Sequence, residues 1–376
     1  MSMPSKASKR IVVKIGTNLL TGRRAFDGHI LEGLVQEIVS LKQDQGMDVL
    51  IVTSGAVGCG MDALGLVKRP TALPEKQAVA AVGQARLMHY YETLFRVYGK
   101  GMTTAQILLT QADLDSRQNY LNIRNTLSTL FTMKSVVPVV NENDSTATEE
   151  LRFGDNDTLA AKIAAKANAD LLIILTDVDG LFDKDPREDP TASLIREVTQ
   201  ITDEIEALAG GAGSIASTGG MRTKLQAAKI AVAAGVDCII TSGYRKRVLH
   251  QILAGEAPHT NFRPAKVALS HRKRWIAFGR SICGTLHVDA GATAALVEKG
   301  KSLLPVGVQK VEGRFGAGAA VRIVDDAGAM IACGLANYDS ETIDLLKGKK
   351  TEEITSILGH NDYDEIVHRD NLVLMH

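Results

Sequence analysis

Residues 136–182 constrain the fold of this chain more than any other stretch. Two apolar, β-branched runs, Val136 to Val140 and Leu171 to Leu175, are too short for helices and end at polar or acidic residues, so they predict buried parallel strands. The alanine-rich stretch between them, Thr158 to Ala169, predicts a helix capped by one residue of Asp155 to Asp157. A strand, a loop, a helix and a second strand make one βαβ unit.

Polar residues collect at the carboxyl ends of the two predicted strands, where open α/β sheets bind their ligands. They form three segments, Asn141 to Asp144, Asp155 to Asp157 and Thr176 to Asp179, and we expect these to face a common crevice that is the active site. Ordinary interpretations exist for some of them. One of Asp155 to Asp157 is needed as a helix cap, Ser54 could cap a helix after an earlier strand, and Asp177 could be a turn residue. Three polar residues in a row exceed what one cap requires.

The same alternation extends over residues 1–258. Further strands are predicted at Arg10 to Gly16, Asp48 to Ser54, Thr103 to Leu109 and Val236 to Thr241. Further helices are predicted at His29 to Gly46, Glu75 to Val97 and Ser116 to Met133, and from Thr218 through Ala234. This order predicts an α/β domain with an open, mainly parallel sheet and helices on both faces. The glycine-rich stretch Gly210 to Gly220 is not expected to be rigid without a ligand.

The pattern changes at Pro258. From Arg263 to Arg280 there are six Lys or Arg and no Asp or Glu, so we expect a basic linker at residues 259–281. Beyond it, short alternating runs punctuated by glycine predict a small β-rich, barrel-like domain at residues 282–360. A tail at residues 361–376 follows. Two domains are also what a chain of 376 residues should form.

Charge and hydropathy exclude several classes of protein. The chain has 43 Lys and Arg against 43 Asp and Glu, so no net charge draws it to nucleic acid or to an anionic membrane. No apolar run approaches the roughly 20 residues that span a bilayer, and we expect a soluble cytoplasmic protein. The four cysteines are scattered without metal-ligand spacing, so we expect small buried apolar residues and no metal site made by the protein.

Two lysines stand where an anion would bind. Lys14 ends the first predicted strand just before Gly16, and Lys224 follows a Gly-Gly pair at the start of a predicted helix. Cationic side chains beside free N–H groups at helix starts suit a polyphosphate. A solvated lysine is the ordinary alternative for Lys14, but burying its charge without an anion would cost several kcal/mol. Neither a P-loop nor a Rossmann glycine motif occurs at these places.

Motifs along essentially the whole chain resemble the bacterial glutamate 5-kinase family. They read VVKIGTNLLTG, VTSGAVGCGMDALG, AAVGQARL, VVPVVNENDSTAT, FGDNDTLAA, ILTDVDGLF, TGGMRTKLQAA, VDAGATAAL, SLLPVGV and HRD. NEND, GDND and TGGMxTK, in this order, are far more specific together than singly. The resemblance implies the amino-acid-kinase fold followed by a PUA domain.

The resemblance also implies a reaction and a role for each matching residue. The reaction is ATP-dependent phosphorylation of the γ-carboxylate of L-glutamate to L-glutamyl 5-phosphate, the first step of proline biosynthesis, with Mg²⁺ accompanying ATP. Lys14 would contact the ATP phosphates, Lys224 would stabilise the moving phosphoryl group, and Asp157 would hold both lysines in place. The implied glutamate ligands are Ser54, Asp144 and Asn156. The implied nucleotide-binding residues are Lys14, Thr176, Asp177, Thr218, Gly219, Gly220, Met221, Arg222, Thr223 and Lys224.

Regulation and partners follow from the same resemblance. Asp115 to Arg124 falls where this family shapes the glutamate pocket and senses proline as a feedback inhibitor. A homo-oligomer is expected, and a glutamyl-phosphate reductase is the expected partner because glutamyl phosphate is labile. The segment Cys59 to Met61 and the residue Arg222 depart from the family form. These departures leave the reaction class intact and bear on the strength of glutamate and proline binding.

One alternative is a kinase of the same fold for N-acetylglutamate, aspartate or UMP. Such relatives commonly show a second glycine after the first-strand lysine, where this chain has Lys14, Ile15, Gly16 and Thr17. They are also not expected to carry the C-terminal domain.

The other alternative is an RNA-binding protein, because PUA domains contact RNA in tRNA-modifying enzymes. Residues 282–360 contain eight Lys or Arg and ten Asp or Glu, a net charge of minus two. Binding to a phosphate backbone calls for a basic face, so RNA is not the expected partner.

Overall fold

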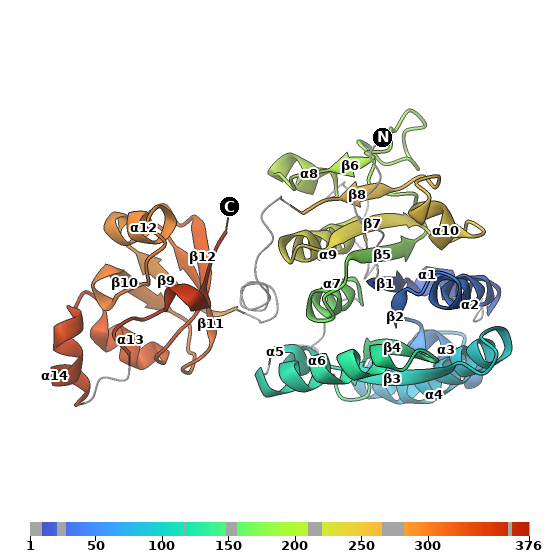
Figure 1. Ribbon diagram of the computed structural model, residues 1–376, viewed down its shortest axis with the longest axis horizontal. Helices are drawn as coiled ribbons and strands as arrows, with labels where there is room; N and C mark the ends of the chain where they lie inside the picture. The colour runs from blue at the N-terminus through green and yellow to red at the C-terminus, as the bar shows by residue number, and fades with distance from the viewer. Residues whose placement is uncertain are drawn as a thin grey trace. The chain divides into compact units, whose positions relative to one another are not determined.

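The computed structural model describes residues 10–20, 28–115, 117–147, 156–209, 220–264, 282–359 and 363–375. The chain divides into two compact units, Met1–Ala268 and Leu269–His376. Figure 1 draws both units, and each is described by itself below.

An eight-stranded sheet with the order β3-β4-β2-β1-β5-β7-β8-β6 forms the centre of the first unit. Its strands are β1 (Arg10–Ile15), β2 (Asp48–Val52), β3 (Thr103–Leu109), β4 (Val136–Glu142), β5 (Leu171–Thr176), β6 (Glu197–Val198), β7 (Asp237–Ser242) and β8 (Thr260–Phe262). All neighbouring pairs are parallel except the antiparallel pair β7 and β8. The predicted open, mainly parallel sheet is therefore confirmed.

Helices cover both faces of this sheet. They are α1 (Thr17–Leu20), α2 (Gly28–Gln43), α3 (Ala56–Ala63), α4 (Leu73–Tyr98), α5 (Gln111–Asp115), α6 (Arg117–Thr132), α7 (Asn156–Lys166), α8 (Asp203–Leu208), α9 (Met221–Ala233) and α10 (Val248–Leu253). Figure 1 shows α7 and α9 side by side on one face of the central strands, with α2 and α10 on the other. Apolar runs on both faces are what a sheet covered on both sides requires.

The alternation of side chains along β1 decides which face Lys14 occupies. Val13 and Ile15 belong to the apolar cluster formed with α2 and α10. Because successive side chains of a strand point to opposite faces, Lys14 lies on the other face, where α7 packs against β1. The central position of β1, between β2 and β5, buries Lys14 to 5% exposure.

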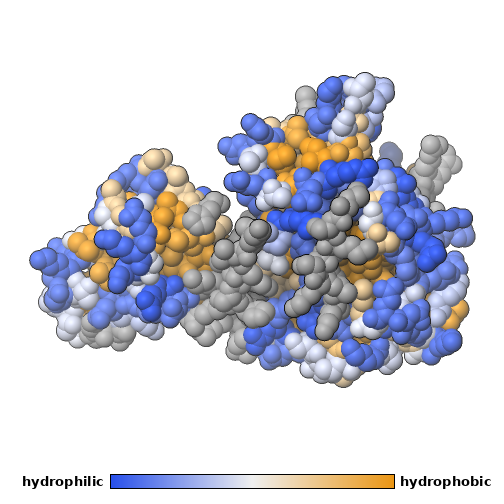
Figure 2. Space-filling model, turned by 45° about the horizontal axis from the view of Figure 1, so that its top comes forward, coloured by the Kyte–Doolittle hydropathy of each residue, from blue (hydrophilic) through white to orange (hydrophobic). Residues whose placement is uncertain are grey.

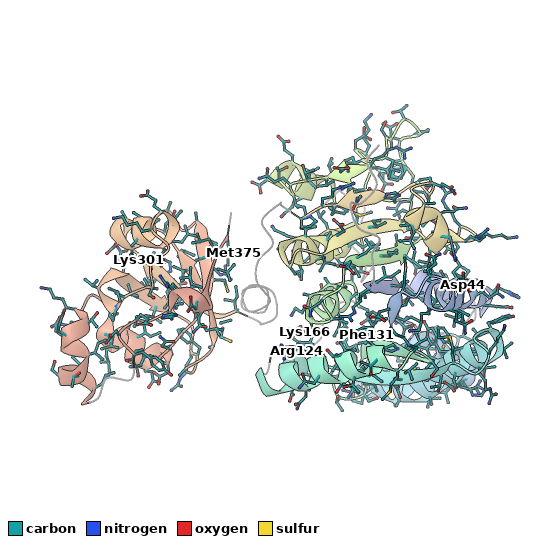
Figure 3. All side chains as sticks on the ribbon, viewed as in Figure 1. Asp44, Arg124, Phe131, Lys166, Lys301 and Met375 are labelled. Atoms are coloured by element: carbon teal, nitrogen blue, oxygen red, sulfur yellow. The ribbon has the colours of Figure 1, made fainter. Side chains whose placement is uncertain are left out.

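Contacts from two elements hold α7 and α6 in place beside the sheet. Lys166, labelled on α7 in Figure 3, donates a hydrogen bond of 3.1 Å from Nζ to the carbonyl oxygen of Leu114 at the end of α5. The guanidinium of Arg10 lies 4.1 Å from the ring centroid of Phe131, labelled on α6. Such a cation–π contact joins β1 to α6. The C-terminal end of α7 is therefore anchored to α5.

Two glycines allow α3 and α4 to cross in backbone contact. A Cβ atom added at Gly83 of α4 would overlap the carbonyl oxygen of Ala56, and one added at Gly60 of α3 would overlap that of Val79. Gly55, the residue before α3, has a φ of 99°, a conformation that glycine adopts without strain. The chain therefore turns sharply out of β2 and sets α3 directly against α4.

The second unit contains a five-stranded sheet with the order β10-β9-β11-β12-β13. Its strands are β9 (Ile282–Val288), β10 (Val308–Glu312), β11 (Ala320–Val324), β12 (Met330–Leu335) and β13 (Leu372–Leu374). Its helices are α12 (Ala290–Val297), α13 (Ser340–Leu346) and α14 (Ile354–Leu358), with 3₁₀ turns at Pro305–Gly307, Thr351–Glu353 and Arg369–Asn371. Only β9 and β11 pair in parallel within this sheet, and the unit has its own apolar core. The expected small β-rich domain is confirmed.

Two short strands lie in stretches where the sequence predicts a linker and a tail. Strand β8 (Thr260–Phe262) lies inside the stretch expected to be a linker, yet it pairs with both β7 and β6. Strand β13 (Leu372–Leu374) lies inside the expected tail, yet it pairs with β12. Both strands have only three residues, too few for an alternating pattern to reveal. Residues 210–219 and 265–281, which include the glycine-rich loop and most of the basic linker, lie outside the described residues.

The sequence predicts that no segment spans a bilayer and that the four cysteines are buried. Figure 2 shows mostly hydrophilic residues on the visible face, with smaller hydrophobic areas between them. None of the helices in the described ranges has the length and apolar character needed to cross a bilayer. Cys59, Cys238 and Cys333 are buried as expected, whereas Cys283 is exposed, which corrects the expectation for that residue.

Candidate active site

The candidate site is built at the carboxyl ends of the central parallel strands. Lys14 stands next to last in β1, level with Val52 of β2 and Ile174 of β5. The strand β2 ends at Val52, two residues before the predicted end at Ser54. Thr53 and Ser54 therefore follow the strand directly. Helices α7 and α9 begin at this same edge and supply the other side chains.

A buried carboxylate lies between two buried ammonium groups. Asp157, in the first turn of α7, has no exposed surface, and Lys14 and Lys224 are each 5% exposed. Lys14 Nζ lies 2.5 Å from Asp157 Oδ1, and Lys224 Nζ lies 3.2 Å from Asp157 Oδ2. The structure thus brings together three residues from β1, α7 and α9. Asp157 and Lys224 are 67 positions apart in the sequence.

Electrostatics keep Asp157 ionised. Burial by itself would raise the pKa of the Asp157 carboxyl, but the charges and hydrogen bonds of Lys14 and Lys224 outweigh burial and lower that pKa below its ordinary value. Two ammonium groups therefore converge on one carboxylate at this edge of the sheet. Cationic side chains gathered beside a helix start suit an anionic ligand.

The first turn of α9 is linked to the same carboxylate. Thr223 Oγ1 lies 2.8 Å from the carbonyl oxygen of Gly220 and 3.2 Å from Asp157 Oδ2. Gly220 is the extended residue before α9, and Met221 is its first helical residue. Arg222 is exposed. Of the glycine-rich segment expected to bind nucleotide, Thr218 and Gly219 lie outside the described residues, as does Asp155.

Asn156 is held by acceptors from two strand ends. Its Nδ2 lies 2.6 Å from the carbonyl oxygen of Thr53, 2.8 Å from Asn141 Oδ1 and 3.2 Å from Ser54 Oγ, so its two hydrogens are shared among three acceptors. Its Oδ1 is buried and has no hydrogen-bond partner within the described ranges. An amide oxygen accepts hydrogen bonds only. The pair Ser54 and Asn156, both expected as substrate ligands, is therefore assembled with an acceptor still available.

The other expected substrate ligand, Asp144, lies in the turn that follows β4 and is half-buried. The turn closes through hydrogen bonds from the amides of Thr146 and Ala147 to the carbonyl oxygen of Asn143. It is tied to α4 by Gln77, whose Nε2 donates to the carbonyl oxygen of Ala147 at 3.2 Å. Asp144 thus stands beside the same strand end as Asn141.

Thr176 and Asp177 lie on the opposite side of β1 from the amide groups. Thr176 Oγ1 donates to Asp177 Oδ1 at 3.0 Å, and Asn18 Nδ2 donates to Asp177 Oδ2 at 3.3 Å. A cavity of about 440 Å³ opens there, and Asp177, Phe182, Tyr244 and Arg245 are among the residues lining it. This volume is in the range of ordinary ligand sites.

Gln84 is a residue of the site that the sequence did not single out. It lies on the buried side of α4, 9% exposed, and its Oε1 accepts a hydrogen bond of 2.8 Å from Asn141 Nδ2. The available signal was a polar side chain among the apolar positions of that helix, next to Gly83. Propensity and periodicity alone do not say what such a residue contacts.

Comparison with known proteins identifies the family of the chain. The model of the amino acid kinase family matches residues 9–242, and the PUA domain model matches residues 284–358. A protein named glutamate 5-kinase from Caldanaerobacter subterraneus subsp. tengcongensis is 51% identical over 367 residues, covering 97% of this chain and 98% of that protein. Another glutamate 5-kinase, from Moorella thermoacetica, is 51% identical over 369 residues, covering 98% and 97%. The chain therefore belongs to the amino acid kinase family, among the glutamate 5-kinases that carry a C-terminal PUA domain.

Proposed function

We propose that this protein transfers the γ-phosphoryl group of ATP to the γ-carboxylate of L-glutamate, giving L-glutamyl 5-phosphate and ADP. This is the first step of proline biosynthesis. The observation that carries the proposal is the buried cluster at the carboxyl edge of the sheet, in which Lys14 and Lys224 converge on Asp157. The names of the relatives of this chain point to glutamate as the substrate.

The chemistry needs no general base. The γ-carboxyl of glutamate has a pKa of about 4.3 in reference peptides, so it is already an anionic nucleophile at neutral pH. One of its oxygens forms the new bond to the γ-phosphorus, and the bond from that phosphorus to the β–γ bridging oxygen breaks as ADP leaves. What remains for the protein is in-line positioning and neutralisation of the charge on the phosphoryl oxygens.

The lysines of the cluster fit that task. Lys14 is proposed to contact the ATP phosphates and Lys224 to stabilise the moving phosphoryl group. Asp157 is the positioning group, because it contacts both ammonium groups and stays ionised. Mg²⁺ supplies further charge neutralisation when bound, and it usually binds to proteins through nucleotide phosphates and few carboxylates. Its association with the nucleotide therefore needs no dedicated cage of protein ligands.

The two substrates are proposed to approach from opposite sides of β1. Glutamate is proposed to lie against Ser54, Asn156 and Asp144. The acceptor Oδ1 of Asn156 suits a donor such as the α-ammonium group of the substrate. The nucleotide lies over Thr176 and Asp177, beside the cavity of about 440 Å³. Residues 218–224 are proposed to close over ATP, since Lys224, in the first turn of α9, is directed to Asp157.

The reaction is tested by trapping its product. With Mg-ATP and hydroxylamine, we expect L-glutamate to give γ-glutamyl hydroxamate together with an equal amount of ADP, because hydroxylamine attacks an acyl phosphate. N-acetylglutamate and UMP serve as the competing acceptors in parallel reactions. Absence of hydroxamate from glutamate, or faster ADP release with either competitor, would contradict the proposed substrate.

Further properties are proposed from the family resemblance. Proline is proposed as an inhibitor that competes with glutamate, through the segment at residues 115–124, of which Ser116 lies outside the described residues. The protein is proposed to act as a homo-oligomer and to pass its labile product to a glutamyl-phosphate reductase. Adding proline to the hydroxamate assay tests the first of these, because a competitive inhibitor raises the apparent KM for glutamate and leaves kcat unchanged.

A further inference from the structure

Gln84 lies beneath the proposed glutamate site. It is on α4 and 9% exposed. The neighbouring Gly83 brings α4 into backbone contact with Ala56, the first residue of α3. That close crossing carries the side chain of Gln84 to the end of β4, where its Oε1 accepts from Asn141 Nδ2 at 2.8 Å.

Two backbone groups fix the orientation of the amides in this network. The amide N–H of Glu142 can only donate, and it donates to Asn141 Oδ1 at 2.9 Å. The Nδ2 group of Asn141 must therefore face Gln84, which meets it with Oε1. The carbonyl oxygen of Thr53 can only accept, and it receives Asn156 Nδ2 at 2.6 Å. The side-chain amides thus form a single consistent chain from Gln84 through Asn141 to Asn156.

We propose that Gln84 is a positioning residue for glutamate, acting through Asn141 on Asn156. This inference rests on the proposed function. If the Oε1 acceptor is removed, Asn141 Nδ2 loses its hydrogen bond in a buried place, which costs more than losing an exposed one. Asn141 then shifts or turns, and Asn156 Nδ2 loses the acceptor that Asn141 Oδ1 provides. The lysine cluster does not share these hydrogen bonds, so the effect falls on glutamate rather than on ATP.

The test is a kinetic comparison of Gln84→Met with the wild type in the hydroxamate assay. Methionine keeps the length of the side chain and removes the acceptor. The KM for glutamate is expected to rise about tenfold, the change that corresponds to about 1.4 kcal/mol, while kcat and the KM for ATP change less than about twofold. A loss of ground-state binding raises KM without lowering kcat. Partial unfolding would lower the apparent kcat and leave KM unchanged, so instability cannot imitate this result.

Two further variants separate positioning from general structural effects. Gln84→Glu retains an acceptor for Asn141 Nδ2 and is expected to restore most of the glutamate affinity. Gln43→Met is the matched control, because Gln43 Nε2 donates to the carbonyl oxygen of Gly99 at 2.9 Å in a tie between α2 and the end of α4. That variant should keep the wild-type KM for glutamate.

The outcomes distinguish this inference from the proposed function. If the wild type forms no glutamyl hydroxamate, the proposed function fails. If the wild type forms it and Gln84→Met has an unchanged KM for glutamate, the role of Gln84 is wrong while the function stands. An equal rise of KM in Gln84→Glu and Gln84→Met would also overturn the role, because the acceptor would then not be what matters.

Discussion

Lys224→Ala is expected to lower kcat by about 10² to 10³-fold, the usual cost of removing one preorganised group that stabilises transition-state charge. The ammonium group of Lys224 is buried and directed to Asp157, at the place where the phosphoryl group is proposed to pass. The fold should persist, because Asp157 keeps its ion pair with Lys14. The measurement is the steady-state rate of hydroxamate formation, with the far-ultraviolet circular dichroism spectrum as the check of folding.

Lys229→Ala is the matched control for this variant. Lys229 is on the same helix, α9, but its side chain is 52% exposed and pairs with Glu206 at the surface. Exposed ion pairs contribute little to stability, so this variant should keep wild-type kcat. Near-normal turnover in Lys224→Ala would remove the role assigned to Lys224.

Gly83→Ala is expected to destabilise the protein by more than about 4 kcal/mol, a cost that few single substitutions reach. The added Cβ would overlap backbone atoms of Ala56 and Gly60, which cannot move aside as a flexible side chain would. Separating α3 from α4 would also displace Ser54 and Gln84, so the KM for glutamate should rise in the fraction that still folds. Urea unfolding at neutral pH measures the loss of stability.

Gly33→Ala provides the comparison within the same unit. Gly33 is an exposed residue inside α2, and a Cβ there would meet no atom within 4 Å. Alanine is favoured over glycine in a helix interior by about 1 kcal/mol, so this variant should be as stable as the wild type or more stable. If Gly83→Ala and Gly33→Ala unfold at the same urea concentration, the proposed backbone crossing is not a determinant of stability.

The sequence predicts the central sheet and the meeting of its strand ends because both depend on strong local patterns. The runs at β4 and β5 are continuously apolar, and their carboxyl ends must share one edge in a parallel sheet. That geometry is enough to place Asn141, Asn156 and Thr176 at one edge. The positions of Lys14 and Lys224, at a strand end and a helix start, were enough to indicate an anion site. The burial of Lys14 on the face of α7 follows from the alternation of side chains along β1.

The parts that the sequence did not reveal depend on contacts between distant segments. The acceptor Gln84 stands 57 residues before its partner Asn141, and nothing local to either residue indicates the pair. Strands β8 and β13 have three residues each and form only because a longer strand is there to pair with them. The cavity beside Asp177 is lined from two separate segments, with Phe182 on one and Tyr244 on the other.

The most direct test of the account is a crystal structure with Mg-ADP, aluminium fluoride and L-glutamate, since planar aluminium fluoride imitates the phosphoryl group in transfer. We expect Nζ of both Lys14 and Lys224 within about 4 Å of the fluoride ligands, an ion-pair distance, with Asp157 between them and glutamate against Ser54 and Asn156. A fluoride group bound away from either lysine, or glutamate bound on the side of Thr176, would contradict the central claim that the cations converge on the transferred phosphate.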